Sequence, residues 1–126
     1  MEFTAEDLVR AAHELGFLDV TPRLVVDWVQ KGLIDQPTKT GRGPGGGRGT
    51  RKGTWSEFQR DLFLREVDQH HDRARRIATL CNIPVFVWLW WGDEWVPLRQ
   101  VVRAMTTYKA TYRSSSLRAG DRKSVV

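Results

Sequence analysis

The residues best suited to bind a ligand lie together near the middle of the chain. Residues 40–53 read TGRGPGGGRGTRKG and hold seven of the eleven glycines. The four cations of this stretch are Arg42, Arg48, Arg51 and Lys52. Glycine lets a backbone approach a partner closely, and the planar guanidinium of arginine fits phosphate well. The chain has no acidic residue between Gln36 and Ser56 that could neutralise these cations, so the stretch predicts contacts with phosphate groups.

These glycines suggest two other interpretations. Gly41, Gly43 and Gly46 fit the spacing G-x-G-x-x-G, but a dinucleotide site needs a buried strand before the motif and a helix directly after it. Here a proline and polar residues precede it, so we discount nucleotide binding. An arginine-glycine segment that binds RNA or single strands stays an alternative, although no aromatic residue lies among these cations.

Residue types that serve catalysis or metal binding are few and scattered. The sequence has one cysteine, Cys81, and no Cys/His spacing typical of a zinc site. His70 and His71 are adjacent, so on a helix they point about 100° apart and do not share a metal readily. No nucleophile is paired with a base along the sequence. We therefore predict no enzyme activity, no metal site and no cofactor.

Three features bear on the compartment of the protein. A single cysteine rules out an internal disulfide and is typical of a reducing cytosol. The first ten residues are acidic and amphipathic, unlike a secretion signal. The longest apolar run, residues 83–91, is shorter than the roughly 20 residues that span a bilayer. We predict a cytoplasmic protein with no membrane partner.

Charge is unevenly distributed over the 126 residues. The net charge of +5 is the balance of two acidic and two basic segments. Residues 36–56 carry five bases and no acid, and residues 97–126 carry seven bases and one acid. Such cationic segments on a near-neutral body indicate an anionic polymer as partner, with simple solubility as the other explanation. The composition, 40% apolar and 28% charged, is that of a globular domain.

Two short helices are expected before the cationic stretch. Thr4 and Asp7 suit the start of the first helix, and Gly16 marks its end. Thr21-Pro22 begins the second, which ends at Gly32. Its apolar face is Leu24, Val25, Trp28 and Val29, and the other face shows Arg23, Val26, Asp27, Gln30 and Lys31. Two helices joined by a tight turn, the second with a polar face, form the helix-turn-helix pattern.

The cationic stretch is expected to lie in a β-hairpin that leads into a third helix. Residues 38–40 and 50–54 are the strands of this hairpin, with the glycines at its tip. Ser56 and Gln59 form a capping box for the next helix. The order is therefore helix, turn, helix, cationic hairpin, helix.

This order resembles the winged helix-turn-helix domain of MerR-like regulators and of the related phage and mobile-element excisionases. The likeness rests on TPRLVVDWVQKGLI, Pro37 and TWSEFQRDL and covers residues 4–72. Gly32-Leu33 matches the Gly-Leu of the family, and Trp55 stands where an aromatic closes the wing. Trp28 replaces the family's tyrosine, Val26 replaces its usual arginine, and the wing is unusually long and glycine-rich.

The resemblance implies DNA contacts along two elements. The second helix would enter the major groove, and the wing would follow phosphates or the minor groove. On the helix the implied contact residues are Thr21, Arg23, Asp27, Gln30 and Lys31. On the wing they are Lys39, Arg42, Arg48, Arg51 and Lys52.

The third helix carries a spacing typical of a coiled-coil seam. Phe63, Val67, His70, Ala74, Ile77 and Cys81 are separated by 4-3-4-3-4 residues. MerR-like proteins dimerise through such a helix, so the resemblance implies a homodimer. The same seam packing on the tryptophan-rich segment of its own chain is the alternative. Asn82-Ile83-Pro84 is expected to end this helix.

A tryptophan-rich segment follows. The run over residues 83–91 is apolar on all sides, so periodicity does not separate helix from strand; Pro84 and Gly92 favour a helix. Trp88, Trp90, Trp91 and Trp95 lie within eight residues, and part of this cluster is expected at an interface with another subunit or protein. A last helix from Pro97 is expected to have the apolar stripe Leu98, Val101, Val102, Met105 and Tyr108.

The predicted fold is mainly α with a small β-hairpin wing. A winged helix-turn-helix occupies residues 1–72 with its wing at about 37–55. A helical extension over 73–113 serves as core or oligomerisation element, and 114–126 form a basic flexible tail. We expect a small transcriptional regulator that binds specific double-stranded DNA. An excision factor on the same fold, an RNA or single-strand binder, and a protein-interaction adaptor are the alternatives.

Overall fold

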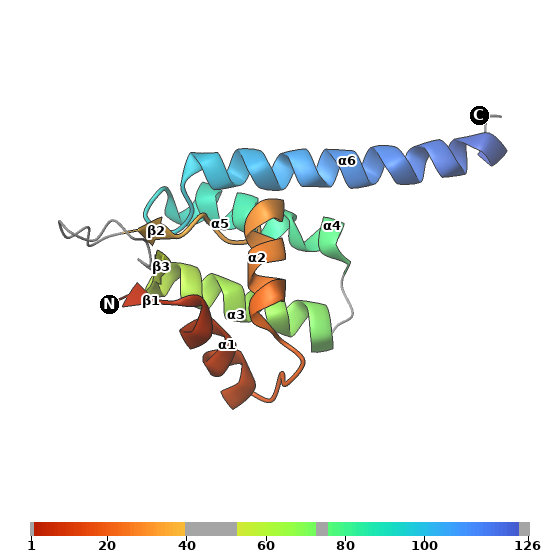
Figure 1. The fold of residues 1–126 in the computed structure, drawn as a ribbon. Coiled ribbons are helices and arrows are strands. Elements are labelled where there is room, and N and C mark those ends of the chain that lie inside the picture. Colours follow the sequence, from red (N-terminus) through yellow and green to blue (C-terminus); the bar gives the residue numbers. More distant parts are fainter. Residues whose placement is uncertain (1, 40–52, 73–75, 124–126) are drawn as a thin grey trace.

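The chain forms a mainly helical fold with a small antiparallel sheet (Figure 1). The computed structural model describes residues 2–39, 53–72 and 76–123, with backbone alone for 39, 72 and 112–123. The elements are β1 (Glu2–Phe3), α1 (Ala5–Glu14), α2 (Pro22–Lys31), β2 (Thr38–Lys39), β3 (Gly53–Ser56), α3 (Glu57–Asp72), α4 (Ile77–Leu80), α5 (Asn82–Trp91) and α6 (Leu98–Lys123). The predicted coarse class, helices with a small hairpin, is confirmed.

Strand β3 is the centre of the sheet, which has the order β1-β3-β2. Thr38 pairs with Thr54 in the predicted hairpin, which is antiparallel. Phe3 pairs with Trp55 on the other side of β3, through the short strand β1, which no sequence pattern predicted. Residues 40–52 lie outside the described residues. The sheet therefore ties the N-terminus and the hairpin to the start of α3.

The first two helices begin and end where their capping residues predict. Thr4 Oγ1 accepts from Asp7 N at 3.2 Å, and the Asp7 carboxylate accepts from Thr4 N at 2.9 Å. This reciprocal pair is a capping box for α1. Thr21 caps α2 in a similar way, and Gly32 ends α2 in the left-handed region.

The core is built mainly from α1, α2 and α3, and α6 packs onto it. Trp28 of α2 and Phe63 of α3 are buried against each other, with ring centroids 5.6 Å apart in an edge-to-face arrangement. Ala104 of α6 belongs to the same cluster, as do Leu80 and Cys81. The segment after residue 72 is thus packed into the core rather than appended to it.

The expected continuous helix over residues 56–81 is not found. Helix α3 ends at Asp72, and α4 begins only at Ile77, after an extended Arg76 with φ −75° and ψ 159°. The coiled-coil seam is therefore interrupted. The heptad spacing predicted a straight helix, whereas the two segments pack Val67 and Leu80 into one core within the chain.

Helices α5 and α6 pack along each other at the top of Figure 1. The helical prediction for residues 83–91 is confirmed, and Gly92 follows its last residue. Helix α6 continues through Lys123 and extends beyond the other elements in the figure. The flexible tail expected from residue 114 is thus helical as far as Lys123. Its alanine, leucine and arginine residues are good helix formers, which the argument from composition overlooked.

The buried face of α6 differs from its predicted stripe. Val101, Ala104 and the polar Gln100 are buried, whereas Leu98, Val102, Met105 and Tyr108 are exposed. The prediction assumed that the longest apolar row faces the core. Gln100 occupies the core-facing row instead because the carbonyls at the end of α2 need a donor there. Among the described residues, no helix combines the length and apolar character needed to cross a bilayer.

Candidate nucleic-acid interface

Helix α2 is fixed at both ends by local contacts. Thr21 Oγ1 accepts from Leu24 N at 3.2 Å, and Pro22 opens the first turn with a backbone angle suited to a helix. Before α2, His13 Nε2 donates to the Val20 carbonyl at 2.8 Å and ties the turn to α1. Gly32 ends the helix with φ +85°. The helix therefore presents one defined face to solvent.

Three side chains form an exposed stripe along that face. Arg23, Val26 and Gln30 follow one another at i, i+3 and i+7, which sets them on one side of a helix. Val25 and Trp28 lie on the opposite side, in the core. The Arg23 guanidinium makes no ion pair with a described residue. The stripe thus offers one unneutralised cation and one amide to a ligand.

Two other predicted contact residues on α2 pair with each other. Lys31 Nζ donates to both carboxylate oxygens of Asp27, at 2.8 and 2.7 Å. Both side chains are partly exposed, and an exposed pair of this kind stabilises a helix by only about 0.5 kcal/mol. A phosphate therefore competes with Asp27 for Lys31 at little energetic cost. Without such a competitor, the pair leaves Arg23 as the free charge of this helix face.

A hollow separates α2 from the base of the hairpin. Its volume is about 510 Å³, and Val26, Val29 and Gln30 line it on the helix side. Gln36, Pro37 and Trp55 line it on the hairpin side. The exposed stripe and the hairpin therefore flank one depression in the surface.

The wing cations are the part of the predicted interface that is not placed. Arg42, Arg48, Arg51 and Lys52 lie outside the described residues, and of Lys39 only the backbone is described. The hairpin strands on either side are described, with Lys39 opposite Gly53. Pro37 packs so closely on Gly53 that a Cβ there would collide with the proline ring. The close contact explains the glycine at the start of β3.

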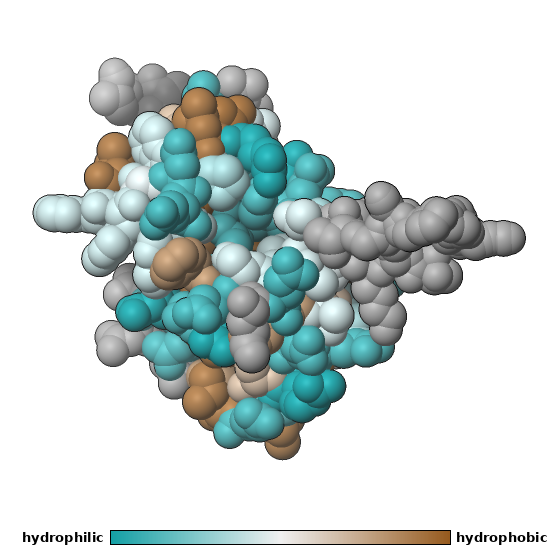
Figure 2. Space-filling model, turned by 90° about the vertical axis from the view of Figure 1, so that its left-hand side faces the viewer, coloured by the Kyte–Doolittle hydropathy of each residue, from teal (hydrophilic) through white to brown (hydrophobic). Residues whose placement is uncertain are grey.

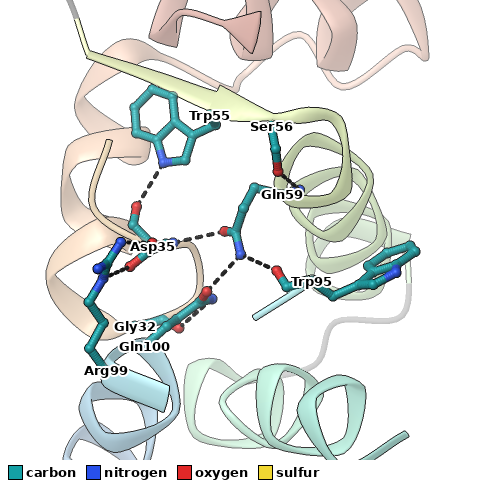
Figure 3. Close-up of polar contacts among 8 residues, drawn as sticks. All are labelled: Gly32, Asp35, Trp55, Ser56, Gln59, Trp95, Arg99 and Gln100. Carbon is teal, nitrogen blue, oxygen red and sulfur yellow. Dashed lines mark hydrogen bonds and ion pairs between the residues drawn. The ribbon is translucent and has the colours of Figure 1, made fainter. Parts of the chain in front are cut away.

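A polar network holds the hairpin against the end of α2 (Figure 3). Trp55 Nε1 donates to the Asp35 carbonyl at 2.7 Å, and Asp35 N donates to Gln59 Oε1 at 2.9 Å. The Asp35 carboxylate accepts from Arg99 at 3.0 and 2.6 Å. Strand β3, helix α3 and helix α6 are thereby joined to the four-residue stretch that follows Lys31.

Two buried glutamines complete this network. Gln59 Nε2 donates to the Trp95 carbonyl at 2.6 Å and to Gln100 Oε1 at 2.8 Å. Gln100 Nε2 donates to the carbonyls of Gly32 and Leu33, at 3.0 Å each. These carbonyls have no partner within α2 because they follow its last turn. The network fixes the orientation of the exposed stripe relative to the hairpin.

Only one contact of this network is predictable from the sequence pattern. That pattern predicts a reciprocal capping box between Ser56 and Gln59, and Ser56 Oγ does accept from Gln59 N at 3.2 Å. The Gln59 side chain, however, points into the core and serves Asp35, Trp95 and Gln100 instead. Gln59 lies between Phe58 and Arg60, and Gln100 lies between Arg99 and Val101, so neither position stands out in the sequence as a buried polar residue.

Comparison with protein-family models, curated proteins and solved structures found no match for this chain. Its function is therefore inferred from its own residues and geometry.

The predicted subunit-interface residues fall into two groups. Phe63 and Val67 are fully buried in the core of the chain, so their assignment to an interface is wrong. His70 and Ile77 are half-buried; the His70 ring lies edge-on to Trp28, 5.8 Å away, and Ile77 packs on the core. Phe63, Val67 and Ile77 pack within the chain against α1, α2 and α4. The partly buried Trp88 and Trp95 belong to a second cluster with Leu62 and Val96, so the seam does not pack on the tryptophan-rich segment, as the alternative expected.

The tryptophans are divided between the body and the surface. Trp88 is half-buried and donates to Asp93 at 2.8 Å, while Trp95 stacks on Phe58 with centroids 4.7 Å apart. Trp90 and Trp91 are 76% and 61% exposed. Only the latter two therefore offer large apolar surface to a partner.

Two buried groups with possible chemistry lie in the core, away from the exposed stripe. Burial raises the pKa of the Glu66 carboxyl well above its usual value, and neither of its oxygens has a hydrogen-bond partner. Burial, together with the charge of Glu66, raises the pKa of the Cys81 thiol to about 12, so the thiol stays protonated. No three metal-ligating side chains gather in the described part of the chain.

Proposed function

We propose that the chain binds double-stranded DNA through a winged helix-turn-helix and acts as a small transcriptional regulator. Helix α2 lies in the major groove, and the hairpin β2–β3 follows the backbone or the minor groove. The observation that carries this proposal is the exposed stripe Arg23–Val26–Gln30 on a helix capped at both ends. It flanks the same hollow as the hairpin that leads into the cationic stretch.

The chemistry of the stripe suits base edges. Arginine pairs with the two acceptors of guanine, and glutamine pairs with the acceptor and donor of adenine. Both side chains extend from a helix of ordinary diameter, which the major groove admits. A fixed helix is required for such readout because each contact depends on the placement of a particular donor.

The surface at the sheet end also favours a hydrated partner. In Figure 2, which shows the left-hand side of Figure 1, the hydrophobic residues form separate patches between hydrophilic ones. Protein-binding surfaces present a larger continuous apolar area. Residues 40–52, which connect β2 to β3 along the chain, carry four cations, and phosphate neutralisation supplies most non-specific DNA affinity.

An excision factor that directs an integrase would use the same DNA contacts as a transcriptional regulator. A footprint at a promoter indicates the regulator, and a footprint at an attachment site indicates the excision factor. The adaptor alternative has one specific observation in its favour, the exposed pair Trp90 and Trp91. We assign this pair to self-association of the DNA-binding chain. A cytoplasmic location is part of the same proposal.

Competition binding tests the proposal. A labelled duplex is bound at low salt and displaced by unlabelled duplex, single strands or RNA of the same sequence. Duplex is expected to compete best, and affinity is expected to fall with a log-log salt slope of about −4.5, which corresponds to roughly five phosphate contacts. Replacing Arg42, Arg48, Arg51 and Lys52 with alanine should flatten that slope. Better competition by RNA or single strands would replace this proposal with the single-strand alternative.

A further inference from the structure

Val26 is an apolar side chain in the middle of the exposed stripe of α2. It is 57% exposed, and Arg23 and Gln30 lie about one helical turn before and after it. Leu24, Val25 and Val29 of the same helix are buried or half-buried and supply the contacts of α2 with the core. The exposed valine is therefore not required for the fold of α2.

Val26 is the apolar side chain at the centre of the stripe. On the hairpin side it lines the 510 Å³ hollow together with Val29 and Gln30, opposite Gln36, Pro37 and Trp55. On the other side, the carboxylate of Asp27 accepts two hydrogen bonds from Lys31 Nζ. A ligand that approaches the centre of the stripe thus meets a methyl surface.

We propose that Val26 contacts the 5-methyl group of a thymine in the major groove and thereby selects thymine at one position of the target. The inference rests on the proposed DNA-binding function. Among the four bases, thymine alone presents an apolar group in the major groove. Adenine, guanine and cytosine present donors or acceptors there, and an apolar side chain would remove these groups from water without replacing their hydrogen bonds.

The neighbouring side chains predict where this thymine lies. A helix rises about 1.5 Å per residue, so Val26 lies about 4.5 Å from Arg23 and about 6 Å from Gln30 along the axis. Base pairs are about 3.4 Å apart. The thymine is therefore within about two base pairs of a guanine read by Arg23 and of an adenine read by Gln30.

Uracil substitution tests the contact because uracil differs from thymine only by the missing methyl group. The preferred duplex is selected with the wild-type protein, and each thymine is then replaced in turn by uracil. Affinity should fall about fourfold at one or two positions, the effect of removing one buried methyl group. At those positions a 5-methylcytosine·guanine pair should bind more tightly than a cytosine·guanine pair.

The same series is then measured with Val26→Ala. This variant should bind the thymine duplex more weakly than the wild type and should lose its sensitivity to uracil at those positions. The matched control is Val102→Ala on α6, since Val102 is 55% exposed and lies outside the stripe. It should retain the full wild-type response.

Two outcomes overturn the inference alone: a selective duplex that tolerates uracil everywhere, or a Val26→Ala variant as sensitive to uracil as the wild type. Absence of selective duplex binding by the wild type overturns the proposed function as well. The selection step therefore separates the failure of one from the failure of the other.

Discussion

Glu66 carries an ionisable carboxyl group in a buried position, where a charge is unfavourable. Its carboxyl group is fully buried on α3, close enough to Cys81 to raise the pKa of that thiol, and both of its oxygens lack a hydrogen-bond partner. Burial disfavours the charged form, so the pKa is raised well above the ordinary value of 4.5. The folded chain therefore binds a proton that the unfolded chain releases above about pH 4.5.

This linkage predicts that Glu66→Gln makes stability less dependent on pH. The folded pKa is raised, so the contribution of Glu66 to stability is fully present below about pH 4.5 and is lost as pH rises from there through the folded value. The glutamine variant has no such loss, and its advantage should grow to at least about 1 kcal/mol by pH 8. Urea unfolding at pH 5 and pH 8 measures the difference.

Glu94→Gln is the control for this experiment because Glu94 is exposed. It should leave the pH dependence of unfolding unchanged. A wild-type protein whose stability relative to Glu66→Gln is the same at both pH values would show that Glu66 ionises without penalty in the folded state.

Residue roles that depend on distant partners could not be predicted from the sequence. Thr4, Thr21 and Gly32 each cap the helix next to them in the sequence. Their roles as helix caps could therefore be predicted from local spacing. Gln100 serves the carbonyls of Gly32 and Leu33 from a position 68 and 67 residues away. A long-range contact of this kind has no period, and so the buried polar network was missed.

At the scale of elements, the contact between the end of α2 and α6 determines where the exposed stripe points. A Cβ on Gly32 would lie 2.7 Å from Ala104 Cα and 2.8 Å from the carbonyl carbon of Arg103. Thr107 Oγ1 also donates to the Lys31 carbonyl at 2.9 Å. The two helices therefore approach so closely that only glycine fits at this crossing.

Gly32→Ala is expected to lower the free energy of unfolding by about 3 kcal/mol, the sum of a left-handed backbone and an overpacked helix crossing. Chemical denaturation measures this loss. The control is Gly16→Ala, which has a similar φ of +100° but nothing within 4 Å of an added Cβ. It should cost only about 1 kcal/mol. Equal losses in the two variants would mean that α6 does not restrain α2.

Most helices and the hairpin were predictable because caps, glycines and apolar periods are local. The interruption between α3 and α4 was not, since the 4-3-4 spacing runs through it without a proline or glycine at residues 73–76. The 4-3-4 spacing marks residues that face the same core, and the two separate helices α3 and α4 place them there as well as one continuous helix would. In helix α6 the apolar spacing correctly indicated a helix but not its buried face, since the longest apolar row faces solvent.

At the scale of the whole molecule, the chain is one body with a helical arm. Helices α4 and α6 contribute Leu80 and Ala104 to the same core as α1 and α2. The predicted division at residue 72 therefore separates two parts of the sequence that share one core. The large apolar side chains left exposed on α5, Trp90 and Trp91 among them, are the surface that we assign to self-association.

Trp90→Ala is expected to weaken a dimer by roughly 2 kcal/mol, or about thirtyfold in the dissociation constant, as for an aromatic at the centre of an interface. Sedimentation velocity over a range of concentrations measures the shift. Because Trp90 is 76% exposed, the variant should keep the wild-type unfolding transition. Leu18→Ala, at a side chain 72% exposed in the turn between α1 and α2, should leave self-association unchanged.

A wild-type protein that is monomeric at all concentrations would contradict self-association through Trp90 and Trp91. It would favour a different protein as the partner of these two side chains. Loss of the folded state in Trp90→Ala would instead make that side chain part of the core.

The central claim, that α2 reads duplex DNA, is tested most directly by the ratio of affinities for a selected duplex and a scrambled duplex of the same length. Fluorescence anisotropy at one fixed salt concentration gives both values for the wild type and for Arg23→Ala. We predict a preference of at least about tenfold for the selected duplex, lost in Arg23→Ala while binding to the scrambled duplex persists. Equal wild-type affinities for the two duplexes, or a preference that survives in Arg23→Ala, would contradict the claim.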